Sequence, residues 1–472
     1  MKSKLNRDIG LLALSATGIC SMLGASVYIV PFMIHRSVPG IGDQVLTAFL
    51  IAAIPAVFAA LSYSALGSAL PEPGGSYIYV SKGLNKFLGF IASFSQWFGL
   101  SIIIGVVSYL AIPFIRDMTI ALEWKEAGQF LSLGKVRVLL SLFLVWTFVL
   151  INLKGNSFYK KALIPLMLLM FGMGCLVIFW GLYFNHSDFL NASEISIPTQ
   201  IQTSHSIPII FGAASILFSS FIGFDSIAQA GGEAKNPSTN IPLAIGLTIL
   251  VVGAFYFLFT YAVYHAVPWP YIAQRAMVED ITAPGLLAPL LSPFMGALII
   301  GGAGIALVND IPAMLLSVSR LTFAWSSDGI FPKIFSKVGT KSKTPSNALL
   351  LSGSMASIGI LGSHFAGDFF LGIDIMVTAM MINFTLMCIT LLLIDRRQPL
   401  IAQKIKIFKT IKARIAVGGI GLILMTIFMG IHLYKNLVLS SQIWYLKSTP
   451  TYLIVMIIGA TIYFYKTNQK VE

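Results

Sequence analysis

Long apolar runs alternate with short polar segments along the whole chain, and each run is about as long as a membrane-spanning helix. A helix needs about 20 apolar residues to cross the hydrocarbon core of a bilayer. We count twelve such runs, near residues 9–33, 45–69, 87–115, 136–153, 162–184, 207–230, 241–265, 293–319, 346–362, 369–394, 415–434 and 450–465. No run alternates with the period of two that a transmembrane β-barrel requires. The pattern predicts an all-α polytopic membrane protein with about twelve transmembrane helices.

Two of the runs, five helices apart, are interrupted by glycine and other small residues in corresponding places. The first run contains "TGICSMLGASVYIVP" (17–31), and the sixth contains "FSSFIGFDSIAQAGG" (218–232). A broken helix frees backbone N–H and C=O groups at mid-membrane depth, where lipid cannot satisfy them but a ligand can. Because five is odd, the second set of five helices would be inverted. The pattern therefore predicts two inverted repeats, about 9–184 and 207–394, with a ligand site at the breaks.

Composition agrees with this class, and the distribution of charge predicts the orientation. The chain is 57% hydrophobic and 10% charged, whereas about a quarter of the residues of a soluble domain are charged. The densest groups of Lys and Arg lie in 320–343 and 395–414, on the side that also holds both termini, and basic loops stay in the cytoplasm. We expect cytoplasmic termini and a plasma membrane, which would be the inner membrane of a bacterium. Segment 395–414 has an amphipathic pattern and is expected on the inner membrane surface.

Catalytic, metal and nucleic-acid functions find no support in the sequence. The three cysteines lie inside apolar runs, without the spacing of a disulfide framework or a metal site. No phosphate-binding loop and no nucleophile motif is present. The net charge of +13 is accounted for by topology. We therefore expect no enzymatic activity, no cofactor, no metal and no nucleic-acid partner.

Charged and polar residues inside the apolar runs are the candidates for chemistry. A charge in the middle of a membrane helix costs roughly 3 kcal/mol on insertion scales, so acids without a role are not expected there. Asp225, and Asp310 with its neighbour Asn309, are candidates for coupling or gating. For Asp225 the alternative is a structural hydrogen bond to a neighbouring helix. Asp310 would be a proton or cation site, or would pair with a basic substrate. Gln96 either contacts the substrate or forms a bond between helices.

Four motifs in order resemble those of the amino acid–polyamine–organocation transporters. They are "GICSMLGASVYIVP" in the first run, "PEPGGSYIYVSKGLNKFLGF" (71–90), "SSFIGFDSIAQAGGEAKNPSTNIP" in and after the sixth run, and "SRLTFAWSSDGIFPKIFSKV" (319–338). The resemblance implies a leucine-transporter-like fold with a ten-helix core, residues 1–394. Residues 395–472 would add an inner amphipathic segment and two peripheral helices. The implied function is secondary transport of amino acids or related amines by alternating access, as a proton symporter or an exchanger.

The resemblance also assigns roles to residues of the two breaks. The substrate carboxylate would meet the break in the first helix, which falls on Leu23, Gly24, Ala25 and Ser26. The substrate amino group would meet carbonyls of the sixth-helix break, which falls on Ser219, Ser220, Phe221 and Ile222. The acid that takes part in inner gating falls on Asp225. Glu233, at the inner end of the same helix, would pair with a basic residue.

Several properties stay open at the level of the sequence. Some members of the resembled family carry a lysine on helix five that replaces a sodium ion, and this chain has Met170 at the matching place. The coupling ion is therefore either a proton or sodium. The alternatives in function are a polyamine or basic amine antiporter, a channel, or a non-transporting sensor on the same fold. Either a monomer or a homodimer is compatible with the sequence.

Overall fold

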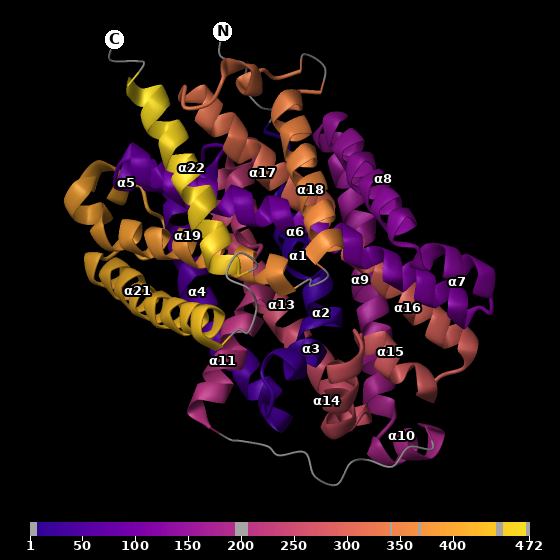
Figure 1. Cartoon of the computed structure of the whole chain (residues 1–472). Coiled ribbons are helices and arrows are strands. Elements are labelled where there is room, and N and C mark those ends of the chain that lie inside the picture. The colour runs from indigo at the N-terminus through magenta and orange to yellow at the C-terminus, as the bar shows by residue number, and fades with distance from the viewer. Residues whose placement is uncertain (1–6, 194–205, 340–341, 367–369, 440–446, 469–472) are drawn as a thin grey trace.

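The structure is a computed structural model that describes residues 7–193, 206–339, 342–366, 370–439 and 447–468, and it is a bundle of helices (Figure 1). Within these ranges a parallel bridge between Ile9 and Ala234 is the single β-type pairing. The α-helices, in chain order, are α1 (Leu11–Met22), α2 (Ala25–Tyr28), α3 (Val30–Ser37), α4 (Val45–Ala69), α5 (Gly75–Gly83), α6 (Lys86–Ala121), α7 (Lys125–Ser132), α8 (Gly134–Leu153), α9 (Asn156–Tyr183), α10 (His186–Ser193), α11 (Ile207–Leu217), α12 (Asp225–Gln229), α13 (Pro237–Ala266), α14 (Trp269–Val278), α15 (Ala283–Leu287), α16 (Pro293–Val308), α17 (Asp310–Ser327), α18 (Ser346–Ala366), α19 (Phe370–Arg397), α20 (Pro399–Ala402), α21 (Ile411–Tyr434) and α22 (Ser448–Asn468). Short 3-10 turns are η1 (Gly42–Gln44), η2 (Phe218–Phe221), η3 (Ala230–Glu233), η4 (Ala288–Leu290) and η5 (Lys333–Ser336), and η6 (Lys435–Leu439) is a π-helical turn.

Eleven helical segments in the described residues are long and apolar enough to cross a membrane, and they correspond to the second to twelfth predicted runs. The first run differs because it forms three short helices, α1, α2 and α3, of which α1 is an apolar helix of 12 residues. A glycine-containing break therefore divides this crossing, as the sequence predicted. The fold class, an all-α polytopic membrane protein with about twelve crossings, is confirmed.

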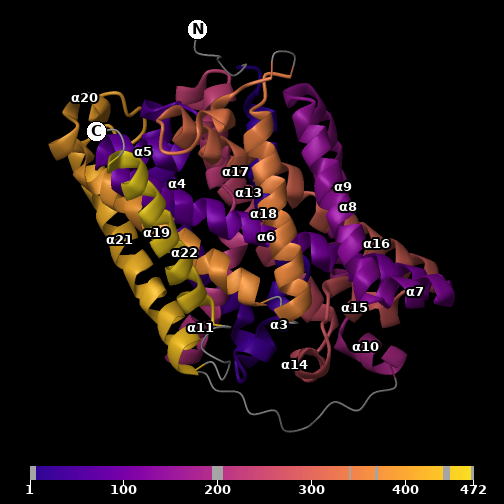
Figure 2. The same ribbon diagram turned by 45° about the horizontal axis from the view of Figure 1, so that its top comes forward.

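Helix α6 forms the centre of the bundle, and other helices form its rim (Figures 1 and 2). α6 packs against α16, α17, α18 and α19. The rim helices α8, α21 and α22 carry large exposed apolar side chains, among them Leu139, Phe143, Ile423 and Ile457. Lipid tails are as apolar as leucine, so this surface suits a bilayer and would be unfavourable in water.

The two ends of the bundle carry different segments. α5, α20 and the end of α22 lie at the end where the described chain begins, and α10 and α14 lie at the opposite end (Figures 1 and 2). The basic segment 395–414, which contains α20, thus shares an end with both ends of the described chain. This placement agrees with an even number of crossings.

The C-terminal region packs on the side of the bundle through α19. α21 contacts α19 and α4, and α22 contacts α19 and α6. After the four-residue helix α20, Lys406 donates its backbone N–H to Ser68 Oγ (3.0 Å) and its Nζ to Ser238 Oγ (2.6 Å). Segment 395–414, expected as an amphipathic stretch on the membrane surface, is therefore tied to the ends of α4 and α13 by polar contacts.

Candidate functional site

The breaks in the first and sixth crossings lie directly against each other. α11 and η2 lead into the second break, and α12 begins after Phe224. Gly223 has φ +136°, a conformation that side chains disfavour, and a Cβ there would lie 2.3 Å from the carbonyl oxygen of Ser21. Ser21 Oγ lies 2.9 Å from Ser226 Oγ. Glycine at 223 is thus required twice, for its backbone conformation and for the close approach of the two chains.

Aromatic side chains hold both breaks in place. The Tyr256 hydroxyl on α13 donates to the carbonyl oxygen of Met22 (2.7 Å), one of the acceptors freed where α1 ends. Phe221 packs against both Tyr256 and Phe49, with ring centroids 6.2 Å and 5.3 Å away. Aromatic side chains of α4 and α13 therefore support the irregular backbone of both breaks.

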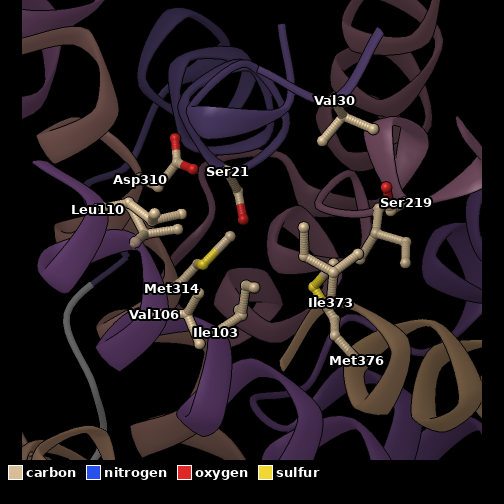
Figure 3. A pocket seen from close by; sticks show the side chains of 12 residues that line it. Ser21, Val30, Ile103, Val106, Leu110, Ser219, Asp310, Met314, Ile373 and Met376 are labelled. Atoms are coloured by element: carbon tan, nitrogen blue, oxygen red, sulfur yellow. The ribbon is translucent and has the colours of Figure 1, made fainter. Parts of the chain in front are cut away.

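A small cavity lies beside the two breaks (Figure 3). Its volume of ≈ 20 Å³ has room for about one water molecule, so the site is closed. The described residues that line it are mostly aliphatic or methionine, and none is Lys, Arg or His. They are Ser21, Val30, Ile103, Val106, Val107, Leu110, Ser219, Ile222, Asp310, Met314, Ile373 and Met376.

The carboxylate of Asp310 fills the space that the missing side chain of Gly24 leaves. Asp310 is the first residue of α17 and is 4% exposed. A Cβ on Gly24 would lie 1.7 Å from Asp310 Oδ2 and 2.1 Å from its Cγ. The break in the first crossing is therefore in direct contact with an acid from the eighth crossing.

The neighbouring position, Asn309, faces α9. Asn309 is buried in the turn between α16 and α17, and its Nδ2 lies 3.5 Å from the sulfur of Met170. Met170 on α9 is itself buried. The side chain of Asn309 therefore meets a thioether and not a charged group of α9.

Asp225 belongs to a buried hydrogen-bond network rather than to the cavity wall. It is the first residue of α12 and is 0% exposed. Its Oδ1 accepts from the Gly223 backbone N–H (3.1 Å), and its Oδ2 accepts from Gln96 Nε2. Gln96 Oε1 in turn accepts from the Ser76 hydroxyl (2.5 Å) and from Gln229 Nε2 (2.9 Å). Buried polar groups at these positions link α5, α6 and α12.

The same network reaches two further helices. Asn383 on α19 donates to the carbonyl oxygen of Ala92 (2.9 Å) and, more weakly, to Gln96 Oε1 (3.4 Å). The Tyr63 hydroxyl on α4 donates to Asn383 Oδ1. We call Tyr63, Ser76, Gln96, Asp225, Gln229 and Asn383 the amide network, and all six are buried.

A buried ion pair lies nearer than the amide network to the end of the bundle that holds α5 and α20. Glu233 Oε1 and Arg320 Nε are 2.5 Å apart, with side chains 1% and 3% exposed. The expected basic partner of Glu233 is therefore Arg320. The backbone of Ile9 donates to Glu233 O (3.0 Å) and accepts from the Lys235 N–H (2.8 Å). These bonds tie the start of the first crossing to the end of the sixth.

The residues predicted at the helix breaks divide into two groups. Ser219 and Ile222 line the cavity, as does the coupling candidate Asp310. Leu23 and Phe221 are buried within the breaks without lining it.

The other predicted residues are placed as follows. Ser220 is buried, and among the described residues neither its Oγ nor that of Ser219 has a hydrogen-bond partner. Ala25 and Ser26 begin α2, and their side chains lie outside the described part of the structure. Gln96 contacts Asp225, and it is not among the residues that line the cavity.

Four members of the amide network were not singled out from the sequence: Tyr63, Ser76, Gln229 and Asn383. Gln229 had the clearest signal, because it follows Asp225 by one helical turn in an apolar run and so shares its face. Ser76, Tyr63 and Asn383 carry no such signal, since hydroxyls and amides are common on membrane helices.

Two interrupted crossings that meet at a closed cavity within a helical bundle are the arrangement found in secondary transporters. The amino acid permease family matches residues 9–460, which is nearly the whole chain. This protein belongs to the amino acid permease family and is an integral, multi-pass membrane protein.

Individual members of the family share about a quarter of the aligned residues with this chain. The chain is 28% identical over 327 residues to the low-affinity putrescine importer PlaP of Escherichia coli K12, covering 68% of each protein. It is 24% identical over 372 residues to the branched-chain amino acid permease BcaP of Bacillus subtilis, covering 77% of this chain and 76% of that one. It is 26% identical over 364 residues to the vacuolar cationic amino acid transporter 2 of Arabidopsis thaliana. That match covers 75% of this chain and 55% of the plant protein, so the chain spans about half of its length.

Proposed function

We propose that this protein carries amino acids or related amines across a membrane by alternating access, as a secondary active transporter. One observation supports this most: the two broken crossings meet at Ser21 and Gly223 beside a cavity that Ser219 lines (Figure 3). A buried hydroxyl without a partner is unfavourable, so a ligand that bonds to Ser219 is stabilised there. The names of the relatives include branched-chain and cationic amino acid transporters and a putrescine importer, which fits this substrate range.

The present conformation corresponds to a carrier closed toward the side of α5 and α20. On that side the amide network, the Glu233–Arg320 pair and the Ile9 backbone bonds all lie between the cavity and the end of the bundle. On the opposite side, Arg36 on α3 pairs with Asp280 (2.7 Å), and both side chains are partly exposed. Exposed ion pairs contribute little, so this pair adds little to closure on that side.

Release of a substrate toward α5 requires the amide network to separate. A carboxylate that takes up a proton loses its charge, and its contacts with fixed donors weaken. Asp225 belongs to this network, and Asp310 borders the cavity, so one of these two acids is the proposed site of the coupling proton. Sodium is the alternative ion.

We place the side of α5 and α20 in the cytoplasm of a plasma membrane, because the basic segments lie there. Single cysteines introduced into 395–414 should react with a membrane-impermeant reagent only after the cells are opened. Reaction in intact cells would reverse the orientation.

The transport core would comprise residues 1–394 as two inverted repeats, with 395–472 peripheral to it. Either a monomer or a homodimer is compatible with this proposal.

Reconstitution into proteoliposomes tests the proposed function. Labelled amino acids and amines should enter by a saturable route, accumulate when a pH gradient is imposed, and exchange with unlabelled substrate inside. Protein-free liposomes and the Gly24→Leu variant serve as controls. No uptake of any compound, or fluxes far above those of a carrier cycle, would contradict it, and the second result would indicate a channel.

A further inference from the structure

The cavity carries an acid in its wall, and the described residues of that wall include no cation. Asp310 is the one ionisable side chain among the described residues that line it. A ligand ammonium group would meet a carboxylate there, whereas a ligand carboxylate would meet no Lys, Arg or His of the described lining. Charges of opposite sign attract at such a site, and like charges in close contact are strongly disfavoured.

The place where a ligand carboxylate would meet the broken first crossing is already held by a carboxylate of the protein. Asp310 Oδ2 and Cγ occupy the position that a side chain on Gly24 would take. A second carboxylate at the same break would lie beside the first. The carboxylate at the first break is thus supplied by the protein, from Asp310 of the eighth crossing.

The rest of the wall suits an apolar ligand body. In Figure 3, Asp310 and Ser21 lie on one side of the cavity and Ser219 on the other, with aliphatic and methionine side chains between them. Methionine side chains such as Met314 and Met376 adapt their shape easily, so the closed cavity can expand around an alkyl chain. The Ser219 hydroxyl can bond to a second polar group of the ligand.

We infer that the substrate is a primary amine without a carboxylate, with its ammonium group at Asp310 and its aliphatic or aromatic body along the wall. This inference rests on the proposed transport function and narrows its substrate class. It sets this chain apart from carriers that hold an amino acid by its carboxylate at the first break.

Pairs of compounds that differ only by a carboxylate provide the test. Suitable pairs are lysine and cadaverine, ornithine and putrescine, leucine and 3-methylbutylamine, and phenylalanine and phenethylamine. Each compound competes against a labelled amine for binding to the purified full-length protein. In at least one pair, the amine should bind about tenfold or more tightly than its amino acid.

The variants assign the preference to a residue. Asp310→Asn should weaken amine binding about tenfold or more while leaving the paired amino acid unchanged or improved, and Asp310→Glu should keep the preference for the amine. Asp374→Asn, a half-buried acid of α19 outside the cavity lining, is the matched control and should leave the preference intact.

Three results would overturn the inference. They are tighter binding of the amino acids in all pairs, an equal loss for both members of a pair in Asp310→Asn, and an Asp310→Asn protein that keeps its amine preference but loses its ion dependence. In each of these cases transport itself would stand. Failure of every compound to bind or enter proteoliposomes would instead count against the proposed function.

Discussion

Asp225 and Asp310 are both buried acids near the middle of the bundle, yet their surroundings differ in kind. Asp225 accepts hydrogen bonds from a backbone N–H and from Gln96, inside a network of amides and hydroxyls. Asp310 lies against the bare α-carbon of Gly24 and borders a cavity of aliphatic and methionine side chains. Burial alone therefore does not distinguish their roles. The fixed donors around Asp225 suit a residue that holds helices together, and the cavity beside Asp310 suits a residue that meets a ligand.

Glu233, like Asp225, is a buried acid held by fixed donors, and its partner is the charged side chain of Arg320. Arg320→Met would leave Glu233 buried without its partner, and breaking a buried ion pair costs about 3–5 kcal/mol. We expect a large fall in the melting temperature of the purified protein. A double variant, Arg320→Met with Glu233→Leu, should recover much of the loss, because the uncompensated charge is gone.

The matched control for this experiment is an exposed ion pair at the same end of the bundle, Lys82 with Glu72. Lys82→Ala should change stability by less than about 1 kcal/mol. A comparable loss in both variants would mean that burial does not set the strength of these pairs.

Gly24→Ala tests the environment of Asp310 with the smallest possible change. The added methyl group would lie 1.7 Å from Asp310 Oδ2, so the carboxylate must move. Displacement of a binding group by about 1 Å can cost about a hundredfold in function, and we expect a loss of that size in the affinity for labelled substrate.

Gly172→Ala on α9 is the control for Gly24→Ala, because a Cβ at position 172 would have no described neighbour within 4 Å. It should bind substrate like the parent protein. Parent-like affinity in Gly24→Ala as well would show that Asp310 and Gly24 do not form part of the site.

Asp225→Asn should cost less free energy than Arg320→Met or Gly24→Ala. The amide places an NH₂ group opposite either the Gly223 N–H or Gln96 Nε2, so one hydrogen bond is lost in either orientation. Hydrogen bonds to charged groups contribute about 1.5–3 kcal/mol, which corresponds to about a tenfold change or more. We expect weaker closure toward α5 and uptake that no longer responds to a pH gradient, while exchange of substrate survives.

Uptake and exchange measured in parallel check this expectation, with Asp374→Asn as the control. Wild-type gradient coupling in Asp225→Asn would assign the acid a purely structural role. Wild-type coupling in both Asp225→Asn and Asp310→Asn would remove both acids from the coupling mechanism.

The sequence was sufficient to predict the crossings and the breaks, because these depend on local properties. Runs of about 20 apolar residues define crossings, and glycine with small neighbours marks the places where a helix can open. The motif that contains Asp225 also predicted a role for that acid beyond the break. Each of these features depends on residues that are close together in the sequence.

The sequence was not sufficient to predict which side chains meet, because the partners are far apart along the chain. Gln96 and Asp225 are separated by 129 positions, and Glu233 and Arg320 by 87. Both interpretations of Gln96 were compatible with its place on α6. Only the packing of α5 against both α6 and α12 brings it to Asp225. The contact of Asp310 with Gly24 likewise depends on how two broken crossings pack.

The hydrogen bonds between Ile9 and residues 233–235 join backbone atoms alone. This affects what a mutational scan can detect. An alanine scan removes side chains, so it leaves both of these hydrogen bonds in place at every position. Among the standard amino acids, proline is the one that lacks the N–H donor, and it would delete one bond when placed at position 9 or 235. A contact that joins the start of one crossing to the end of another would thus be silent in ordinary mutational scans, although it must part whenever those ends separate.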